Sequence, residues 1–299
     1  MAAKSLRIVT FNFLPIAYDL LTNWIRTTGN QHVLAVTTPG PKSRPTPSYK
    51  GIVEKAPRDV DILVTTRLKS VATPLIQALK PDLIACFSFP YRITPELCQI
   101  PTYGAVNLHP AVLPAYRGPN VMRQFYEGAP VFGATLHWIA EEYDTGNILS
   151  QKSAPMPAEV TRNNIFAAWP SLMMGALSEG IARAIAGEAG QAQDDAQASY
   201  AAPFTDAEAW LDWREPQHVL QRKETALNML GPGLAKVMVD GQPNAVMSLE
   251  LLPQIDAAVS PGHCHEKNGD TLVVQAADGP VRIQVQPIMD TTADSESNR

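Results

Sequence analysis

The segment Tyr103-Gly104-Ala105-Val106-Asn107-Leu108-His109-Pro110 is a short, mostly apolar run that ends in polar side chains. Its length and composition predict a buried β-strand over residues 103–108. Because successive side chains of a strand point to opposite faces, Asn107 and His109 are expected on the same face, at the carboxyl end of the strand. An amide beside an imidazole can bind a carbonyl oxygen and handle a proton.

Strands and helices alternate on the amino-terminal side of this segment. The apolar patterns predict strands over 6–11, 33–37, 62–64 and 83–87, and helices over 14–24 and 71–79. This alternation predicts an α/β fold, a doubly wound and mostly parallel sheet with helices on both faces. Ligands of such sheets bind beyond the carboxyl ends of the strands, where Asn107 and His109 fall.

The rest of the chain predicts a helix over 118–127, strands over 132–139 and 148–154, and a long helix over 163–186. The polar, low-complexity run 187–199 indicates a linker. A helix over 215–230 and short strands over 235–239, 246–251, 271–275 and 281–285 predict a small β-barrel-like carboxyl-terminal domain. We therefore expect a first domain over 1–190, a linker over 191–202, a small β-rich domain over 203–290 and a disordered tail over 291–299.

The turn Tyr143-Asp144-Thr145-Gly146 supplies a carboxylate that could orient or charge His109. An Asn, His and Asp set is suited to an acyl transfer that forms no covalent enzyme intermediate. Each residue taken alone has a structural alternative. Asn107 could cap a turn, His109 could be a hydrogen-bonded interior histidine, and Asp144 could hold the turn before Gly146.

The three residues together resemble the formyltransferase family that uses 10-formyltetrahydrofolate. The family pattern is roughly [IV]-N-x-H-x-S-L-L-P-x-[YW]-R-G followed by D-E-G-x-D-T-G. This chain has V-N-L-H-P-A-V-L-P-A-Y-R-G over 106–118 and A-E-E-Y-D-T-G over 140–146. The resemblance covers nearly the whole chain, and it implies the formyltransferase fold, a methionyl-tRNA formyltransferase-like arrangement of two domains, and Asn107, His109 and Asp144 as catalytic residues.

The resemblance also implies a binding region for the cosubstrate, 10-formyltetrahydrofolate. In the family, the stretch after the fourth strand and the Leu-Pro pair of the motif lie beside the folate. The corresponding residues here, with the tyrosine before Asp144, are Phe87, Phe89, Tyr91, Ile93, Leu113, Pro114 and Tyr143. An alternative for the stretch 87–93 is an ordinary strand end whose aromatic side chains fill the core.

Three departures from the family pattern leave the catalytic set intact but concern the acceptor. Ala111 replaces the motif serine, Ala140 replaces the first acid, and Glu142 replaces the glycine. The chain also lacks the Gly-Thr-Pro sequence that follows the first strand in the tRNA enzymes, and the loop 39–47 has few cations diluted by four prolines. These features favour a small-molecule amine or hydroxylamine as acceptor. Two other acceptors stay open as alternatives: methionyl-tRNA, and water, which would make the protein a 10-formyltetrahydrofolate hydrolase. A non-catalytic binding protein is the least favoured class.

Composition bounds the class of protein further. The 299 residues are 45% apolar and carry a net charge of −5. A negative net charge is not typical of a protein whose main function is to bind nucleic acid. Three cysteines without metal-ligand spacing favour a reducing compartment. With neither a leader nor an apolar run of membrane length apparent, we expect a cytoplasmic enzyme without a membrane partner. No metal is expected, and the cluster over 263–266 is placed on a turn.

Three side chains near the catalytic set carry separate expectations. His137 lies in a strand pattern beside Trp138 and is expected in the core. Arg117 could pair with an acid of the Asp144 loop, face the acceptor, or do neither. A carboxylate paired with His109 is expected to raise the histidine pKa above its ordinary value of about 6.5.

Overall fold

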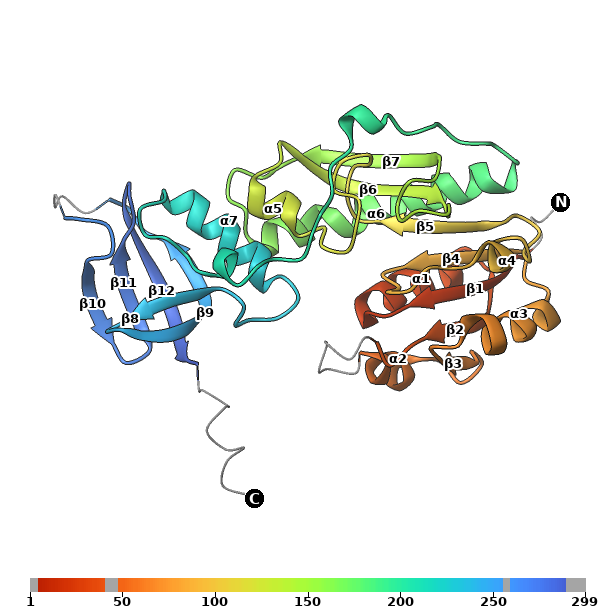
Figure 1. Cartoon of the computed structure of the whole chain (residues 1–299), viewed down its shortest axis with the longest axis horizontal. Helices are drawn as coiled ribbons and strands as arrows, with labels where there is room; N and C mark the ends of the chain where they lie inside the picture. The colour runs from red at the N-terminus through yellow and green to blue at the C-terminus, as the bar shows by residue number, and fades with distance from the viewer. Residues whose placement is uncertain (1–4, 41–47, 255–258, 289–299) are drawn as a thin grey trace, which may run out of the picture. The chain divides into compact units, whose positions relative to one another are not determined.

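The computed structural model describes residues 5–40, 48–254 and 259–288, and these form two compact units (Figure 1). The first unit comprises Met1–Val121, Val131–Pro155 and Ala168–Ala201. The second comprises Met122–Pro130, Met156–Ala167 and Ala202–Arg299. The second unit therefore takes residues from both sides of the expected linker, whereas the first unit ends within it. The expected loop 39–47 and the tail 291–299 fall largely or wholly outside the described residues.

The first unit contains a seven-stranded sheet in the order β3-β2-β1-β4-β5-β6-β7. Its strands are β1 Arg7–Asn12, β2 Gln31–Thr37, β3 Ile62–Val64, β4 Leu83–Phe87, β5 Ala105–His109, β6 Val131–Trp138 and β7 Ile148–Pro155. The first five strands pair in parallel, whereas β5–β6 and β6–β7 are antiparallel. The mostly parallel sheet expected from the alternation of strands and helices is confirmed.

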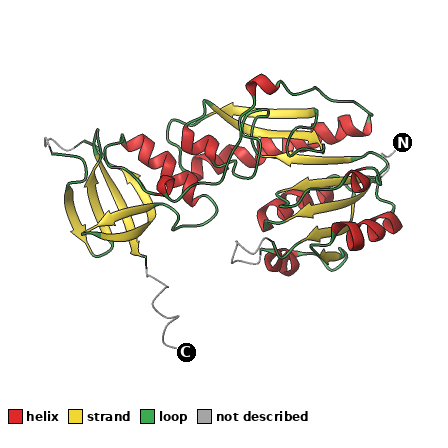
Figure 2. Cartoon of the chain, in the orientation of Figure 1, coloured by secondary structure: helices red, strands yellow, loops and turns green. Residues whose placement is uncertain are grey.

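Helices cover both faces of this sheet (Figure 2). On one face, strand residues such as Phe11 and Cys86 pack with residues of η1 (Leu68–Ala72), α3 (Thr73–Leu79) and α4 (Pro95–Cys98). On the other face, Ala35 packs with α1 (Pro15–Thr27) and α2 (Tyr49–Lys55). Alternate strand residues serve the two faces, as the period of a β-strand requires.

Helix α6, Arg162–Ile185, is the described helix that is long and apolar enough by length and composition to cross a membrane. Within the first unit it packs on the sheet instead. Ser150 of β7 donates a hydrogen bond to the Ala176 carbonyl, and the Trp169 indole donates to the Gly133 carbonyl at 2.7 Å. These contacts are those of a helix in a protein core.

The second unit holds a curled, antiparallel five-stranded sheet in the order β10-β11-β12-β9-β8. The strands are β8 Lys236–Val239, β9 Gln242–Leu251, β10 Cys264–Asn268, β11 Thr271–Gln275 and β12 Pro280–Pro287. Helices α5 (Arg123–Glu127) and α7 (Gln217–Asn228) and turn η3 (Ala207–Ala209) belong to the same unit. The β-rich carboxyl-terminal part expected from the close-spaced strands is confirmed.

Two expectations were wrong in detail. The cluster 263–266 was expected on a turn, but Cys264 begins strand β10, because its residues pair with β11 in antiparallel register. The helix expected over 118–127 is limited to α5, because the backbone at Gly118 has φ of 107° and its N–H binds a side chain outside any helix.

Candidate active site

Strand β5 places Asn107 and His109 on one face of the sheet at its carboxyl edge. Asn107 lies opposite Cys86 of β4 on one side and opposite His137 of β6 on the other. His109 lies opposite Thr135. The side-chain alternation expected from the sequence therefore brings the amide and the imidazole to the same side.

Asp144 reaches these residues from the turn that follows β6. Its backbone has φ of 57°, in the left-handed region that few residues other than glycine adopt. The Gly118 N–H donates a hydrogen bond of 2.9 Å to Asp144 Oδ2. A backbone donor from the 116–118 segment thus fixes one oxygen of the carboxylate and leaves the other for the β5 side chains.

The structure brings the three expected residues together around that second oxygen. Asn107 Nδ2 donates to Asp144 Oδ1 at 3.2 Å, and His109 Nδ1 lies 3.5 Å from the same oxygen. His109 is 3% exposed, and the Asp144 side chain is 11% exposed. The carboxylate is therefore largely removed from water and is satisfied by the groups it can orient.

His137, which was expected to be a core residue, is a fourth polar member of this cluster. Its Nδ1 lies 2.8 Å from the Trp138 carbonyl oxygen, and its Nε2 lies 3.1 Å from Asn107 Nδ2. His137 Nε2 also lies 3.5 Å from Asp144 Oδ1. The pattern of β6 gave the burial correctly, but the antiparallel register that sets His137 opposite Asn107 is not visible in the sequence.

The pKa values of both buried groups, Asp144 and His109, are lowered, and for His109 this is the reverse of the expectation from the sequence. Burial raises the pKa of the Asp144 carboxyl, but the positive charge available at His109 and the hydrogen bonds from His137 and Gly118 outweigh burial and hold that pKa well below its usual range. Burial lowers the pKa of His109 below 6.5, and the neighbouring Asp144 carboxylate offsets this only in part. The expectation of a raised His109 pKa was wrong, because the loss of hydration outweighs the ion pair.

The second ring nitrogen of His109 contacts the main chain. His109 Nε2 lies 2.8 Å from the carbonyl oxygen of Tyr116, a residue with φ of 60°. In either neutral tautomer, one ring nitrogen presents its lone pair to an oxygen, of Tyr116 or of Asp144. The protonated ring can donate to both oxygens, which offsets part of the cost of charging the buried ring.

The residues implied for the folate divide into buried and exposed sets. Phe89 and Ile93 belong to the hydrophobic core, and Phe89 packs edge-on against Phe11 with ring centroids 5.2 Å apart. For these two side chains, the alternative of core filling is the one the structure supports.

The other implied residues lie at the borders of the same region. Phe87 and Leu113 are buried, Tyr91 packs at the edge of the core, and Pro114 precedes the Tyr116 turn. Tyr143 is 50% exposed, and the Arg92 guanidinium lies 6.0 Å from its ring centroid. An exposed aromatic face beside Asp144 suits a binding surface better than a core position.

Arg117 pairs with an acid outside the Asp144 loop. Its Nη2 donates to Asp195 Oδ1 at 2.8 Å and its Nε donates to Gln193 Oε1 at 3.0 Å. Both partners lie in the run expected to be a linker, which no signal in the sequence connected to the site.

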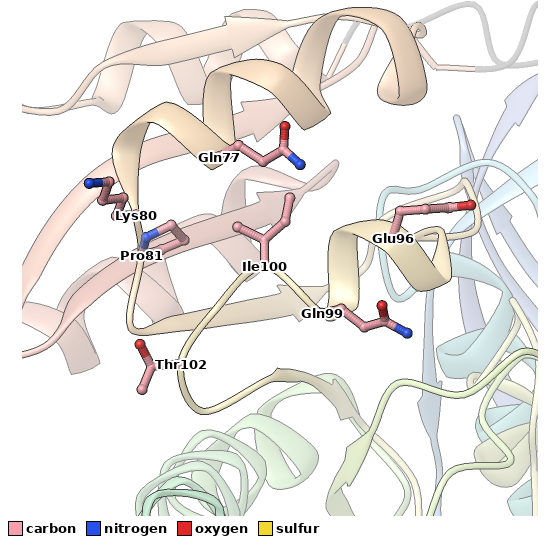
Figure 3. Close-up of a pocket in the computed structure, with 7 residues that line it drawn as sticks. All are labelled: Gln77, Lys80, Pro81, Glu96, Gln99, Ile100 and Thr102. Atoms are coloured by element: carbon pink, nitrogen blue, oxygen red, sulfur yellow. The ribbon is translucent and has the colours of Figure 1, made fainter.

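A surface pocket lies at the opposite edge of the sheet (Figure 3). It is lined by Gln77 and Lys80 near the end of α3, by Gln99 after α4, and by residues that precede β4 and β5. Asn107 and His109 lie at the carboxyl end of β5, so this pocket is separate from them. Among the described residues no group of His, Cys, Asp and Glu could hold a metal ion.

The fold agrees with comparisons to known proteins. Residues 28–175 match the family model described as "Formyl transferase", and residues 203–293 match "Formyl transferase, C-terminal domain". The methionyl-tRNA formyltransferase of Moorella thermoacetica is 30% identical over 215 residues, which covers 71% of this chain and 68% of that protein.

Two solved structures share the fold. HypX from Aquifex aeolicus, in complex with tetrahydrofolic acid, has a TM-score of 0.70 at 17% identity and covers 96% of this chain and 45% of its own. The N-formyltransferase from Helicobacter canadensis, with folinic acid and dTDP-3-aminofucose, has a TM-score of 0.65 at 14% identity and covers 95% and 100%. The chain belongs to the two-domain family of 10-formyltetrahydrofolate-dependent formyltransferases.

Proposed function

We propose that this protein transfers the formyl group of 10-formyltetrahydrofolate to the amine of a small molecule, with Asn107, His109 and Asp144 as its catalytic residues. The observation that carries the proposal is their convergence at the carboxyl edge of the sheet, with Asn107 Nδ2 and His109 Nδ1 3.2 and 3.5 Å from one oxygen of Asp144. The cosubstrate supplies an activated formyl group whose leaving group is a folate nitrogen, so neither a metal nor a nucleophilic side chain is required.

Asn107 is proposed to bind the oxygen of the formyl group as negative charge develops on it. Its Nδ2 donates to Asp144 Oδ1 and lies 3.1 Å from His137 Nε2. The Nδ2 hydrogen that is not held by the Asp144 carboxylate is the one that we propose binds the substrate oxygen. Removal of an oxyanion donor of this kind costs about 3–4 kcal/mol of transition-state stabilisation in other enzymes.

His109 is proposed to take the proton that the amine loses after attack. Its lowered pKa leaves it unprotonated near neutral pH, as a base must be. Proton transfer requires Nε2 to exchange the Tyr116 carbonyl for the amine, after which the Asp144 carboxylate stabilises the charged ring. Asp144 thereby favours uptake of the amine proton by His109 during formyl transfer.

The charge of the carboxyl-terminal region favours a small acceptor over tRNA. Residues 202–299 contain seven Lys and Arg against fourteen Asp and Glu, a net charge of −7. Of the six Lys and Arg side chains described in this range, five lie in ion pairs with carboxylates. A surface that grips phosphates needs unpaired cations, because affinity falls with each cation removed.

The test is a tetrahydrofolate-release assay with purified protein, 10-formyltetrahydrofolate and a panel of amines. The panel includes nucleotide-linked amino sugars, hydroxylamines and initiator methionyl-tRNA. Release that depends on a small amine, with the formylated product identified by mass, supports the proposal. Formylation of the tRNA at comparable efficiency would show that the acceptor is the tRNA and not a small amine. Release of tetrahydrofolate without any amine would indicate a hydrolase. The absence of release under every condition would refute catalysis.

We also propose that the enzyme acts in the cytoplasm. The three cysteines Cys86, Cys98 and Cys264 are free thiols, as a reducing compartment maintains them. Fractionation of the native host, followed by detection of the protein, checks this assignment.

A further inference from the structure

We propose that Gln193 is a positioning residue that holds the Asp144 turn in its catalytic conformation. This inference rests on the proposed function, because it concerns how Asp144 is kept in place. Gln193 belongs to the 189–201 segment, which the sequence presented only as a polar linker. In the structure this segment lies in the first unit and runs past the catalytic residues.

The Gln193 amide bridges two carbonyls of the Asp144 turn. Its Nε2 donates to the carbonyl oxygen of Asp144 at 2.8 Å and to that of Gly146 at 2.8 Å. Its Oε1 accepts from Arg117 Nε at 3.0 Å. Both amide hydrogens and the amide oxygen therefore have partners, so the side chain is fixed at three points.

These bonds oppose a specific source of instability. Asp144 adopts a left-handed backbone, with φ of 57°, which an aspartate retains only where its surroundings hold it. Two hydrogen bonds from one amide to the turn carbonyls provide that constraint. The same turn sets where the carboxylate lies relative to Asn107 and His109, so loosening the turn misplaces the reacting groups.

The segment is itself anchored on both sides of Gln193. On one side, Gln191 and Ile148 exchange backbone hydrogen bonds of 2.8 and 2.7 Å at the start of β7. On the other side, Ser199 contacts the 116–118 segment, where its Oγ accepts from the Tyr116 N–H at 2.9 Å. Gln193 thus links the Asp144 turn to Arg117. Arg117 lies between Tyr116, whose carbonyl contacts His109, and Gly118, whose N–H contacts Asp144.

Two substitutions separate positioning from simple packing. Gln193→Ala removes all three hydrogen bonds. Gln193→Glu keeps the shape and the contact with Arg117 but sets a carboxylate oxygen against the two carbonyl oxygens, so it cannot hold the turn. Gln191→Ala is the matched control, because Gln191 lies on the same segment and bonds to Ile148 through its backbone N–H and carbonyl.

We expect both Gln193 variants to lower kcat by about 10²-fold, the scale of a misplacement of about 1 Å, with KM for 10-formyltetrahydrofolate nearly unchanged. Gln191→Ala should keep wild-type kcat. In an Asp144→Asn background, Gln193→Ala should cause little further loss, because the group it positions has already been replaced. An equal loss in both backgrounds would show that Gln193 does not act through Asp144.

A second measurement is independent of turnover. The Gly118 amide donates to Asp144 Oδ2, so its hydrogen exchange, followed by NMR, reports how firmly the carboxylate is held. Gln193→Ala should accelerate exchange at Gly118, and Gln191→Ala should not. If Gln193→Ala changes neither the hydrogen exchange of the Gly118 amide nor kcat, the inference about Gln193 is overturned. The proposed function is judged separately, because an inactive Asp144→Ala variant would still support it.

Discussion

Asp144→Asn is the substitution that tests the catalytic site most directly. Asparagine matches aspartate in shape and tolerates the left-handed backbone that position 144 requires. The change therefore removes the charge and one hydrogen-bond acceptor while the turn is kept. We expect normal folding and a large loss of turnover.

The magnitude follows from the geometry around Asp144. His109 Nδ1 lies 3.5 Å from Asp144 Oδ1. With an effective dielectric constant of about 20, a charged imidazole at that separation gains about 4–5 kcal/mol from the carboxylate. If His109 is charged in the transition state, loss of this interaction lowers kcat by about 10³-fold.

The assay is tetrahydrofolate release with the preferred amine, combined with thermal unfolding to verify that the variant is folded. Asp144→Ala serves as the comparison and should lose at least as much activity. A folded Asp144→Asn protein that retains more than about a tenth of wild-type kcat would refute the proposed role of the carboxylate.

The pH profile adds a second check on the same variant. Burial lowers the His109 pKa, so the rising limb of kcat/KM that belongs to the enzyme should lie below pH 6.5 with a weakly basic amine. Asp144 raises that pKa and His137 lowers it, so loss of the Asp144 charge should move the limb to still lower pH. Asp144→Asn should also lose more activity with strongly basic amines, whereas equal losses across an amine series would mean that Asp144 only orients the site.

Three further predictions concern other positions. Asn107→Ala and His109→Ala should each lower kcat by about 10²-fold or more with little change in folate affinity, and a near wild-type rate would remove that residue from the mechanism. Gly146→Ala should destabilise the fold by about 1–3 kcal/mol and abolish activity, because a Cβ there would lie 1.7 Å from the Trp138 carbonyl oxygen; an unchanged midpoint of urea unfolding would contradict this. Burial lowers the pKa of His32 to about 4, so between pH 6.5 and 4 the unfolded chain binds a proton that the folded chain does not. The free energy of unfolding should therefore fall by up to about 3 kcal/mol as the pH is lowered from 6.5 to 4. His32→Gln should remove that part of the pH dependence of urea unfolding.

Much of the fold and of the proposed catalytic set could be predicted from the sequence. Apolar runs and their spacing predicted where the strands of the mostly parallel sheet lie. This works because burial imposes either a period of two or a continuous apolar run on each strand. The alternation along β5 also gave the shared side of Asn107 and His109. Asp144 was tied to them by motif resemblance, and the structure shows the contact.

Other features depended on contacts between distant parts of the chain. His137 reaches Asn107 only because β6 runs antiparallel to β5, and strand direction leaves no mark on the pattern of a single strand. The His109 pKa depended on burial, which outweighs the effect of the nearby carboxylate. Gln193 lies in a polar, low-complexity run, and its role follows from hydrogen bonds to the Asp144 turn 49 residues away in sequence. Local composition determined the elements and the chemical groups, whereas tertiary structure decided which of those groups meet.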